Sequence, residues 1–505
     1  MFRRFPKTDG GSLPVWFLTV WRSTVWLMIA AAAAVTPGTA AAQTALPSST
    51  PAATTPAAPP GTDTLEAGGP GFFSGITRRD SLLGDLGGVR SALGRRGVTF
   101  TLSETSEILG NVSGGVKRGF DYDGLTQMGL QVDTEKAFDW AGGTFNVSAL
   151  QIHGRNLSAD NLQSLQTASG IEADRATRLW ELWYQQAFLD GQMDVKVGQQ
   201  SLDQEFIVSS NALLFVNTMF GWPMIPSADL PGGGPAYPLS ALGMRFRGKP
   251  TEALTLLGGV YNGSPAQSNA GDAQLLNSTG TRFPTNGGVL AFAELQFETP
   301  ANGAMVQPGH GKSLPGVYKL GAWYDSERFA DQRYDTSGLS LADPASSGNP
   351  RQHRGNFSIY GVADQTLWQA EGEEPQALNF FTRIMGAPAD RNLISFSLNA
   401  GLTLKAPLPD RDNDTFGLGM GFAQVSGYAG NLDKDTNSFS GTNNPVRSSE
   451  TFVEATYQIQ VLPWWQVQPD FQYVFNPGGG VANPNNAGQR IKNEAVLGVR
   501  TVITF

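Results

Sequence analysis

Apolar and polar residues alternate one by one over most of this chain. That is the period of a β-strand whose two faces meet different surroundings. The last twelve residues, 494–505, show the pattern plainly. Leu497 and Val499 fall on one face, Arg500 falls on the other, and the chain ends on the aromatic Phe505. We expect this last segment to close a sheet against the first strand.

Sixteen segments with this alternation can be marked between residue 98 and the C-terminus. An even number is expected when both ends of an antiparallel barrel lie on the same side of a membrane. The segments span residues 98–109, 125–135, 144–153, 178–189, 193–201, 240–247, 253–262, 288–298, 317–326, 356–367, 377–386, 393–405, 415–425, 450–461, 466–475 and 494–505.

The connections between these segments differ in length in a regular way. Short ones (190–192, 248–252 and 462–465) alternate with long ones (154–177, 202–239, 263–287, 327–355 and 426–449). Short periplasmic turns and long external loops are typical of outer-membrane barrels, whereas a soluble sandwich or propeller requires no such alternation. Connection 299–316 is long for a turn, and 387–392 is short for an external loop. The pattern predicts an all-β, sixteen-stranded antiparallel transmembrane β-barrel over 98–505.

The N-terminus has the pattern of an export signal. Basic residues are followed by an apolar stretch, 25–35, and by small residues up to Ala42. The apolar stretch is too short to cross a bilayer, which needs roughly 20 residues, so we expect residues 1–42 to be a cleaved signal peptide. Residues 43–70 are rich in Pro, Ala and Thr and are expected to form a disordered spacer.

A short helix is expected next, within an N-terminal helical segment at 71–97. Leu82, Leu86, Val89 and Leu93 recur at helical spacing. The preceding Asp80 is a candidate N-cap, and Gly97 is a candidate stop. Glycines within this stretch weaken the helix. It is the clearest helical pattern in the chain, and we expect it on the periplasmic side.

Composition excludes several classes of function. The net charge is −9 with no basic block, so nucleic acid is not an expected partner. The chain has no cysteine, which removes thiol catalysis, disulfides and cysteine metal sites. The mean hydropathy of −0.20 resembles that of a soluble protein. It is also compatible with a membrane barrel, whose two faces average out.

Several segments closely resemble the OprB family of carbohydrate-selective porins. They lie at 83–99, 107–115, 179–185, 197–206 and 220–223, and their order and spacing make the set specific. The resemblance runs from about Leu82 to Phe505. It implies an outer-membrane barrel that passes small sugars, glucose among them, down their gradient. Leu86 departs from the tryptophan expected in many relatives, which leaves the details of the N-terminal helix open.

The lumen can be assigned by giving the more apolar face of each strand to lipid. In 178–189 this rule turns Trp180 outward and Glu181 and Trp183 inward. In 240–247 it turns Met244 outward. We expect a set of inward side chains to form the constriction and bind sugar: Glu181, Trp183, Lys196, Arg245, Arg247, Glu294 and Arg383. Arg500 is expected to face the lumen as well.

A lumen that contains acidic, basic, amide and aromatic side chains is suited to binding a sugar. Carboxylates and guanidinium groups replace water around its hydroxyls, and an aromatic face covers its C–H surface. The alternative, left open for each residue, is that inward charges brace one another or hold a folded-in loop. Loop 202–239, with 220–223 and the glycines 232–234, is the best candidate to fold inward.

Other functions find less support. An outer-membrane enzyme would need a nucleophile beside a base. The chain has only His153, His310 and His353, no Gly-x-Ser-x-Gly elbow, and only Ser148 near His153. An adhesin or a general, non-selective porin stays open. The acids Asp410, Asp412 and Asp414 lack calcium-loop spacing and are expected in a solvated turn; we expect neither metal nor cofactor.

The expected location is the Gram-negative outer membrane, reached after export. The expected partners are small carbohydrates, outer-membrane lipid and lipopolysaccharide, and the barrel-assembly machinery during biogenesis. The terminal aromatic Phe505 resembles the signal that this machinery recognises. Assembly into a homo-oligomer is left open. The preferred sugar and the pore radius do not follow from the sequence.

Overall fold

The structure is a computed structural model that describes residues 75–267, 271–299, 314–371 and 374–505. The predicted signal peptide and spacer lie outside the described residues and stay predictions. So does His310, together with most of the long connection 299–316.

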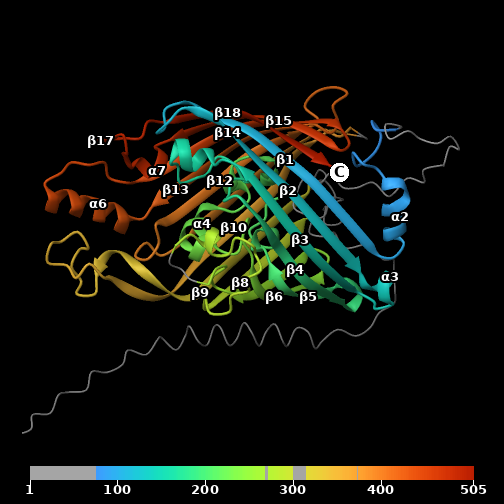
Figure 1. Cartoon of the computed structure of the whole chain (residues 1–505), viewed down its shortest axis with the longest axis horizontal. Coiled ribbons are helices and arrows are strands. Elements are labelled where there is room, and N and C mark those ends of the chain that lie inside the picture. Colours follow the sequence, from blue (N-terminus) through green and yellow to red (C-terminus); the bar gives the residue numbers. More distant parts are fainter. Residues whose placement is uncertain (1–74, 268–270, 300–313, 372–373) are drawn as a thin grey trace, which may run out of the picture. The chain divides into compact units, whose positions relative to one another are not determined.

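Sixteen antiparallel strands close into one barrel (Figure 1). They are β1 (Val98–Ser113), β2 (Gly119–Asp133), β3 (Gly143–Gly154), β4 (Ala176–Phe188), β5 (Met193–Gln200), β6 (Ala241–Thr251), β7 (Leu254–Asn262), β8 (Val289–Thr299), β9 (Gly316–Asp335), β10 (Pro350–Gln369), β11 (Ala377–Gly386), β12 (Ile394–Lys405), β13 (Thr415–Val425), β14 (Ser449–Leu462), β15 (Trp465–Phe475) and β18 (Glu494–Thr504). A small separate hairpin, β16 (Ala482–Asn483) with β17 (Asn486–Arg490), lies in the last long loop. Each predicted segment corresponds to one barrel strand, so the predicted fold class is confirmed.

The C-terminal strand closes the barrel, as its alternation predicts. β18 pairs with β1 from Ser103↔Thr504 onward and with β15 on its other side. Leu497 and Val499 are 48% and 45% exposed on the outside of the wall, whereas Val496, on the opposite face of the strand, is buried. The strand therefore presents its apolar face outward and its other face to the lumen.

Two strands exceed their predicted segments the most. β9 and β10 have 20 residues each and pair to their outer ends, Asp335 with Pro350. Their outer halves carry polar residues on both faces, so the apolar alternation ends before the strands do. The hydrophobic pattern marked only the part of this hairpin that is half apolar.

The N-terminal helix is shorter than predicted. A 3-10 turn, η1 (Leu86–Gly88), leads into α2 (Val89–Gly94). Asp80 is not the N-cap, because Gly87 and Gly88 have φ values of 69° and 96° and break the helix between Leu86 and Val89. Asp85 accepts a hydrogen bond from Ser91 N at 2.7 Å instead. Arg90 of α2 donates to the carbonyl of Phe505, which ties this helix to the end of the chain.

The longest helix of the described residues, α6 (Gly427–Ser440), lies in connection 426–449, where only a loop was expected. Ser426 caps it, and Asp435 forms a bidentate pair with Arg333 of β9 at 2.7 and 3.0 Å. Its polar composition hides the helical period, so the helix depends on contacts with the outer part of β9. The other short helices are α3 (Thr134–Phe138), α4 (Met224–Asp229), α5 (Ala273–Leu276) and α7 (Pro477–Gly480). Within the described ranges, no helix has both the length and the apolar character needed to cross a membrane.

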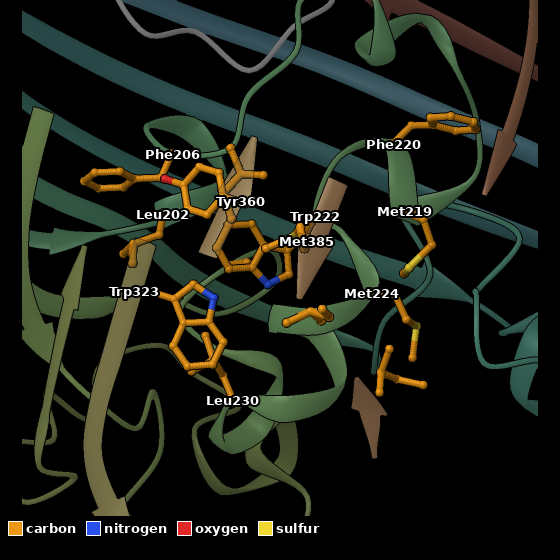
Figure 2. Packing of buried hydrophobic residues seen from close by; sticks show 14 of the residues in the cluster. Leu202, Phe206, Met219, Phe220, Trp222, Met224, Leu230, Trp323, Tyr360 and Met385 are labelled. Carbon is orange, nitrogen blue, oxygen red and sulfur yellow. The ribbon is translucent and has the colours of Figure 1, made fainter. Parts of the chain in front are cut away.

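The hydrophobic core lies inside the barrel. Residues 201–240, which we call the inward segment, connect β5 to β6 and fill part of the lumen with buried side chains such as Phe206, Phe220 and Trp222. These side chains pack against inward residues of the wall, including Trp323 of β9 and Tyr360 of β10 (Figure 2). The prediction that loop 202–239 folds inward is confirmed.

Candidate lumenal site

Carboxylates of the barrel wall hold the inward segment by its backbone. Glu294 of β8 accepts a hydrogen bond from Ile207 N at 2.9 Å. On the other side of the lumen, Glu454 of β14 accepts from Val216 N at 2.6 Å and from Asn217 N at 3.0 Å. A charged acceptor strengthens such bonds. The segment is therefore fastened at two distant parts of the wall and crosses the lumen between them.

Polar and charged side chains of the wall also bond to the same segment, and most of them donate to its backbone carbonyls. Arg383 of β11 is 1% exposed and donates to the carbonyls of Ile207 at 3.4 Å, Met219 at 2.6 Å and Gly221 at 3.1 Å. Further wall-to-segment bonds run from Lys319 to Val208 O (2.7 Å), from Gln468 to Leu214 O (2.7 Å) and from Ser209 Oγ to Asp364 (2.7 Å). The segment thus covers the wall from β8 round to β15.

A second loop, 155–175, reaches the same part of the lumen. Glu450 of β14 accepts from Leu165 N at 2.8 Å and from Gln166 N at 2.7 Å, and Gly478 N adds a bond of 2.7 Å. Thr167 of this loop donates to Thr218 of the inward segment at 2.6 Å. The two loops brace each other in front of β14 and β15.

A charged cluster lies where the inward segment leaves β5. Lys196 pairs with Glu205 and lies over the ring of Trp183, 4.2 Å from its centre. Arg245 pairs with Asp194 and also with Glu205, at 3.0 Å. Burial works against the charged form of Glu205, yet Lys196 and Arg245 lower its pKa. These ion pairs favour the charged form of Glu205 and attach the start of the inward segment to the wall.

Arg245 and Arg247 are predicted to form the constriction, and both pair with the carboxylate of Asp194. The Arg247–Asp194 distance is 2.6 Å. We expect the double change Arg245→Ala plus Arg247→Ala to alter single-channel conductance by about two-fold and to weaken sugar block, since it removes two inward cations. Planar-bilayer recordings with added sugar measure both. Unchanged conductance and unchanged sugar affinity would contradict the assignment.

A cavity of about 480 Å³ remains between the inward segment and the opposite wall, β1 to β4 with β18. Its polar lining includes Thr99, Thr101, Ser103 and Thr105 of β1, Gln127 and Gln131 of β2, Asn146 and Ser148 of β3, Glu181 of β4, Asp203, Gln204 and Asn217 of the inward segment, Gln466 and Gln468 of β15, and Arg500 of β18. Arg90 and Phe505 line it too, so the cavity reaches the end of the barrel that carries the N-terminal helix.

The predicted orientation of Trp180, an aromatic residue of this cavity, is wrong. Trp180 was expected to face lipid, but it is 3% exposed and lines the cavity. A bulge between β3 and β4 pairs Ser148 with Glu181 and Ala149 with Leu179, so Trp180 is an extra residue and points inward beside Glu181. Its ring meets Tyr237 of the inward segment edge-on, with centroids 6.4 Å apart.

Two carboxyl groups also line this cavity. Glu181 of β4 accepts a hydrogen bond from Ser201 N at 3.1 Å. Asp203 accepts from Ser201 Oγ at 2.6 Å and from Tyr237 N at 3.1 Å, while burial raises the pKa of Asp203 above its ordinary range. With the amides around them, these groups present both donors and acceptors to a bound molecule.

The predicted site residues fall into three places. Glu181 lines the cavity; Trp183, Lys196, Arg245 and Arg247 form the charged cluster; and Glu294 and Arg383 lie beneath the inward segment. The sequence reasoning missed the cavity residues of β1 to β3, such as Gln127 and Asn146. The same alternation rule finds them, because each is polar on the face opposite an apolar row.

Residues considered for catalysis or metal binding have other contacts. His153 bonds to Tyr122 Oη at 3.1 Å, whereas Ser148 faces the lumen and accepts from Glu181 N at 3.2 Å, so the two do not meet. His353 pairs with Asp331 at 2.8 Å. Asp414 forms a bidentate pair with Arg411, both bonds at 2.8 Å.

Known proteins that are similar to this chain are porins. Residues 117–505 match the family model described as "Carbohydrate-selective porin, OprB family". The chain is 26% identical to "Porin B" of Pseudomonas aeruginosa over 84% of its own length and 91% of that protein. It is 24% identical to "Putative porin QuiX" of Acinetobacter baylyi, over 79% and 89% respectively. The high-pH structure of Pseudomonas putida OprB superposes with a TM-score of 0.75 at 24% identity, covering 86% of this chain and 100% of that one, which supports the fold.

Proposed function

Since this chain belongs to the OprB family of carbohydrate-selective porins, we propose that it admits small uncharged sugars, glucose among them, by passive diffusion through the cavity beside the inward segment. The family makes the protein an outer-membrane carbohydrate porin, a channel rather than an enzyme. Glucose as a substrate and the path through the cavity belong to the proposal.

The lining of the cavity is the observation that carries the proposal. Amides and hydroxyls make up most of the polar lining, for example Gln127 and Asn146 on the wall and Asn217 on the inward segment, with Glu181 and Asp203 as acceptors. Amide groups donate and accept, so they can replace water around sugar hydroxyls whatever the orientation of the ring. Because no single group makes a strong site, a sugar can leave as readily as it enters, as diffusive flux requires.

The predicted site residues take distinct roles in this proposal. Glu181 contacts the sugar beside the ring of Trp180. Trp183, Lys196, Arg245 and Arg247 bound the path where the inward segment begins. Glu294 and Arg383 act at one remove, because they keep the inward segment in the lumen.

We also propose how the protein is exported and what surrounds its barrel. Residues 1–42 are removed as a signal peptide, and the spacer 43–70 then precedes the barrel in the periplasm. The outward apolar faces meet outer-membrane lipid and lipopolysaccharide. Barrel closure by β18, ending at Phe505, follows insertion by the assembly machinery.

The proposal is tested by comparing glucose with an amino acid of similar size that carries no net charge. We expect liposomes that contain the refolded protein to take up glucose several-fold faster than the amino acid, because a path lined by amides and hydroxyls replaces the hydration of sugar hydroxyls better than the hydration of a zwitterion. Stopped-flow swelling measures both rates with empty liposomes as the control. Equal rates would indicate a general porin, which is the alternative function.

A further inference from the structure

A fully buried carboxylate lies at one end of the seam where β18 closes the barrel against β1. Glu494 is the first residue of β18 and is in phase with the lumenal residues Val496 and Arg500. It is 0% exposed, and neither of its carboxylate oxygens has a hydrogen-bond donor among the described residues. Arg500, the basic residue of β18, pairs with Glu107 instead. A buried carboxylate in this state is strongly unfavourable unless a positive charge compensates it.

Two buried amides near Glu494 also have oxygens without a donor. Asn111 of β1 is 1% exposed, and its Nδ2 donates to two backbone carbonyls of the following turn, at 2.9 and 3.1 Å. Asn161 of loop 155–175 is 1% exposed as well, and its Nδ2 donates to Asp121 at 3.0 Å. These bonds fix the orientation of both amides, so the atoms without a partner are Asn111 Oδ1 and Asn161 Oδ1. Every unpartnered polar atom of the three residues is therefore an acceptor.

Gly115, in the turn between β1 and β2, shows that these three residues converge. Its φ is 67°, and a β-carbon on it would collide with Asn111 Nδ2 and lie 3.0 Å from Asn161 O and 3.3 Å from Glu494 Oε1. The pairing of β1 with β18, which lie side by side in Figure 1, is also irregular here, because one extra residue follows Asn111. Bulges of this kind re-aim side chains and are common beside functional sites.

The burial of this group favours a bare cation over a water molecule. Ca²⁺ lies about 2.3–2.6 Å from its oxygen ligands, whereas a water oxygen needs about 2.7–2.8 Å, and Glu494 has no surface that a water-sized molecule can reach. Among the described residues no three Asp, Glu, His or Cys side chains come together as metal ligands. A cation here must therefore combine one carboxylate with neutral oxygens, a mixture that Ca²⁺ accepts. Mg²⁺ usually keeps several waters, which this site has no room to hold.

We propose that Glu494, Asn111 and Asn161 form a calcium site at the closing seam of the barrel. Glu494 supplies the carboxylate, and the two amides supply neutral oxygens. The negative charge of Glu450 of β14 also acts on Glu494 and adds to the attraction for a cation. The ion links the last strand, the first strand and loop 155–175, at the end of the barrel that carries the long loops. It thereby stabilises the closed barrel and the position of this loop.

Calcium titration of the refolded protein tests this site. The protein is refolded from inclusion bodies, without lipopolysaccharide, and treated with EGTA before isothermal titration calorimetry. We expect one Ca²⁺ to bind per chain and Mg²⁺ to bind about ten-fold more weakly or less. Glu494→Gln keeps the size of the side chain and removes its charge, so it should weaken calcium binding about ten-fold or more. The matched control is Glu454→Gln, because Glu454 is equally buried but accepts from two backbone N–H groups; its calcium affinity should stay unchanged.

Two results would overturn the proposal. The first is a folded, unmodified protein that binds no calcium, which would mean that a proton neutralises Glu494. The second is an unchanged calcium affinity in Glu494→Gln, which would place the ion elsewhere. If Glu494→Gln does not fold, Asn111→Ala and Asn161→Ala replace it, and each should weaken binding several-fold. Thermal unfolding followed by circular dichroism is an independent check, because calcium should raise the Tm of the unmodified protein and leave that of Glu494→Gln unchanged.

Discussion

Replacing Arg383 by methionine is expected to raise single-channel conductance by about two-fold or more, because the inward segment loses its main support from β11. The guanidinium is buried and holds three carbonyls of that segment, those of Ile207, Met219 and Gly221. Each hydrogen bond from a charged donor contributes about 1.5–3 kcal/mol, and the carbonyls would be left without this partner. The segment should then move away from the wall and widen the lumen.

Planar-bilayer recording of the refolded variant measures this effect, and the loss of sugar block should accompany it. Arg411→Met is the matched control, because Arg411 pairs with Asp414 in a turn and does not contact the inward segment. If Arg383→Met fails to fold, Lys319→Met removes a single bond, to Val208 O, and should give a smaller rise. An unchanged conductance in a folded Arg383→Met protein would show that β11 does not hold the segment.

Replacing Trp180 by alanine is expected to weaken glucose block of the channel about ten-fold, the equivalent of about 1.4 kcal/mol of lost ring contact. Trp180 is the extra residue of the β4 bulge and faces the cavity beside Glu181 and Tyr237. A flat ring covers the C–H face of a sugar while the neighbouring carboxylate accepts from its hydroxyls. Ion conductance at saturating salt should change little, because ions make no such contact.

Current-noise analysis with increasing glucose gives the binding constant for this comparison. Trp180→Phe keeps a ring at the position and should retain most of the block. Trp323→Phe, a change beneath the inward segment, controls for altered packing of the lumen. Equal glucose block in Trp180→Ala and the unmodified protein would exclude Trp180 from the sugar path.

The position of the cavity shows where sequence reasoning stops. Alternation correctly turns Arg245, Glu294 and Arg383 inward, and all three are buried inside the barrel. It does not indicate that the inward segment then covers Glu294 and Arg383 and leaves open the wall of β1 to β4. Which wall a loop covers depends on contacts between residues far apart in the sequence, 87 positions for Ile207 with Glu294 and 164 for Met219 with Arg383, which no local pattern contains.

Trp180 shows the same limit at a single residue. A strict period of two assigns it to lipid with Leu182 and Tyr184. One extra residue in β4 relative to β3 shifts the phase, and Trp180 turns toward Tyr237. A bulge depends on the register of two paired strands, so the sequence of either strand alone does not reveal it.

The sequence by itself determined the number of strands, the lipid-facing and lumenal sides of most of them, and the closing role of residues 494–505. These features follow from local alternation, because each strand separates an apolar from a polar environment along its whole length. Only the tertiary structure decided the route of the inward segment and the open wall of β1 to β4. Each of these depends on which strands become neighbours when the barrel closes.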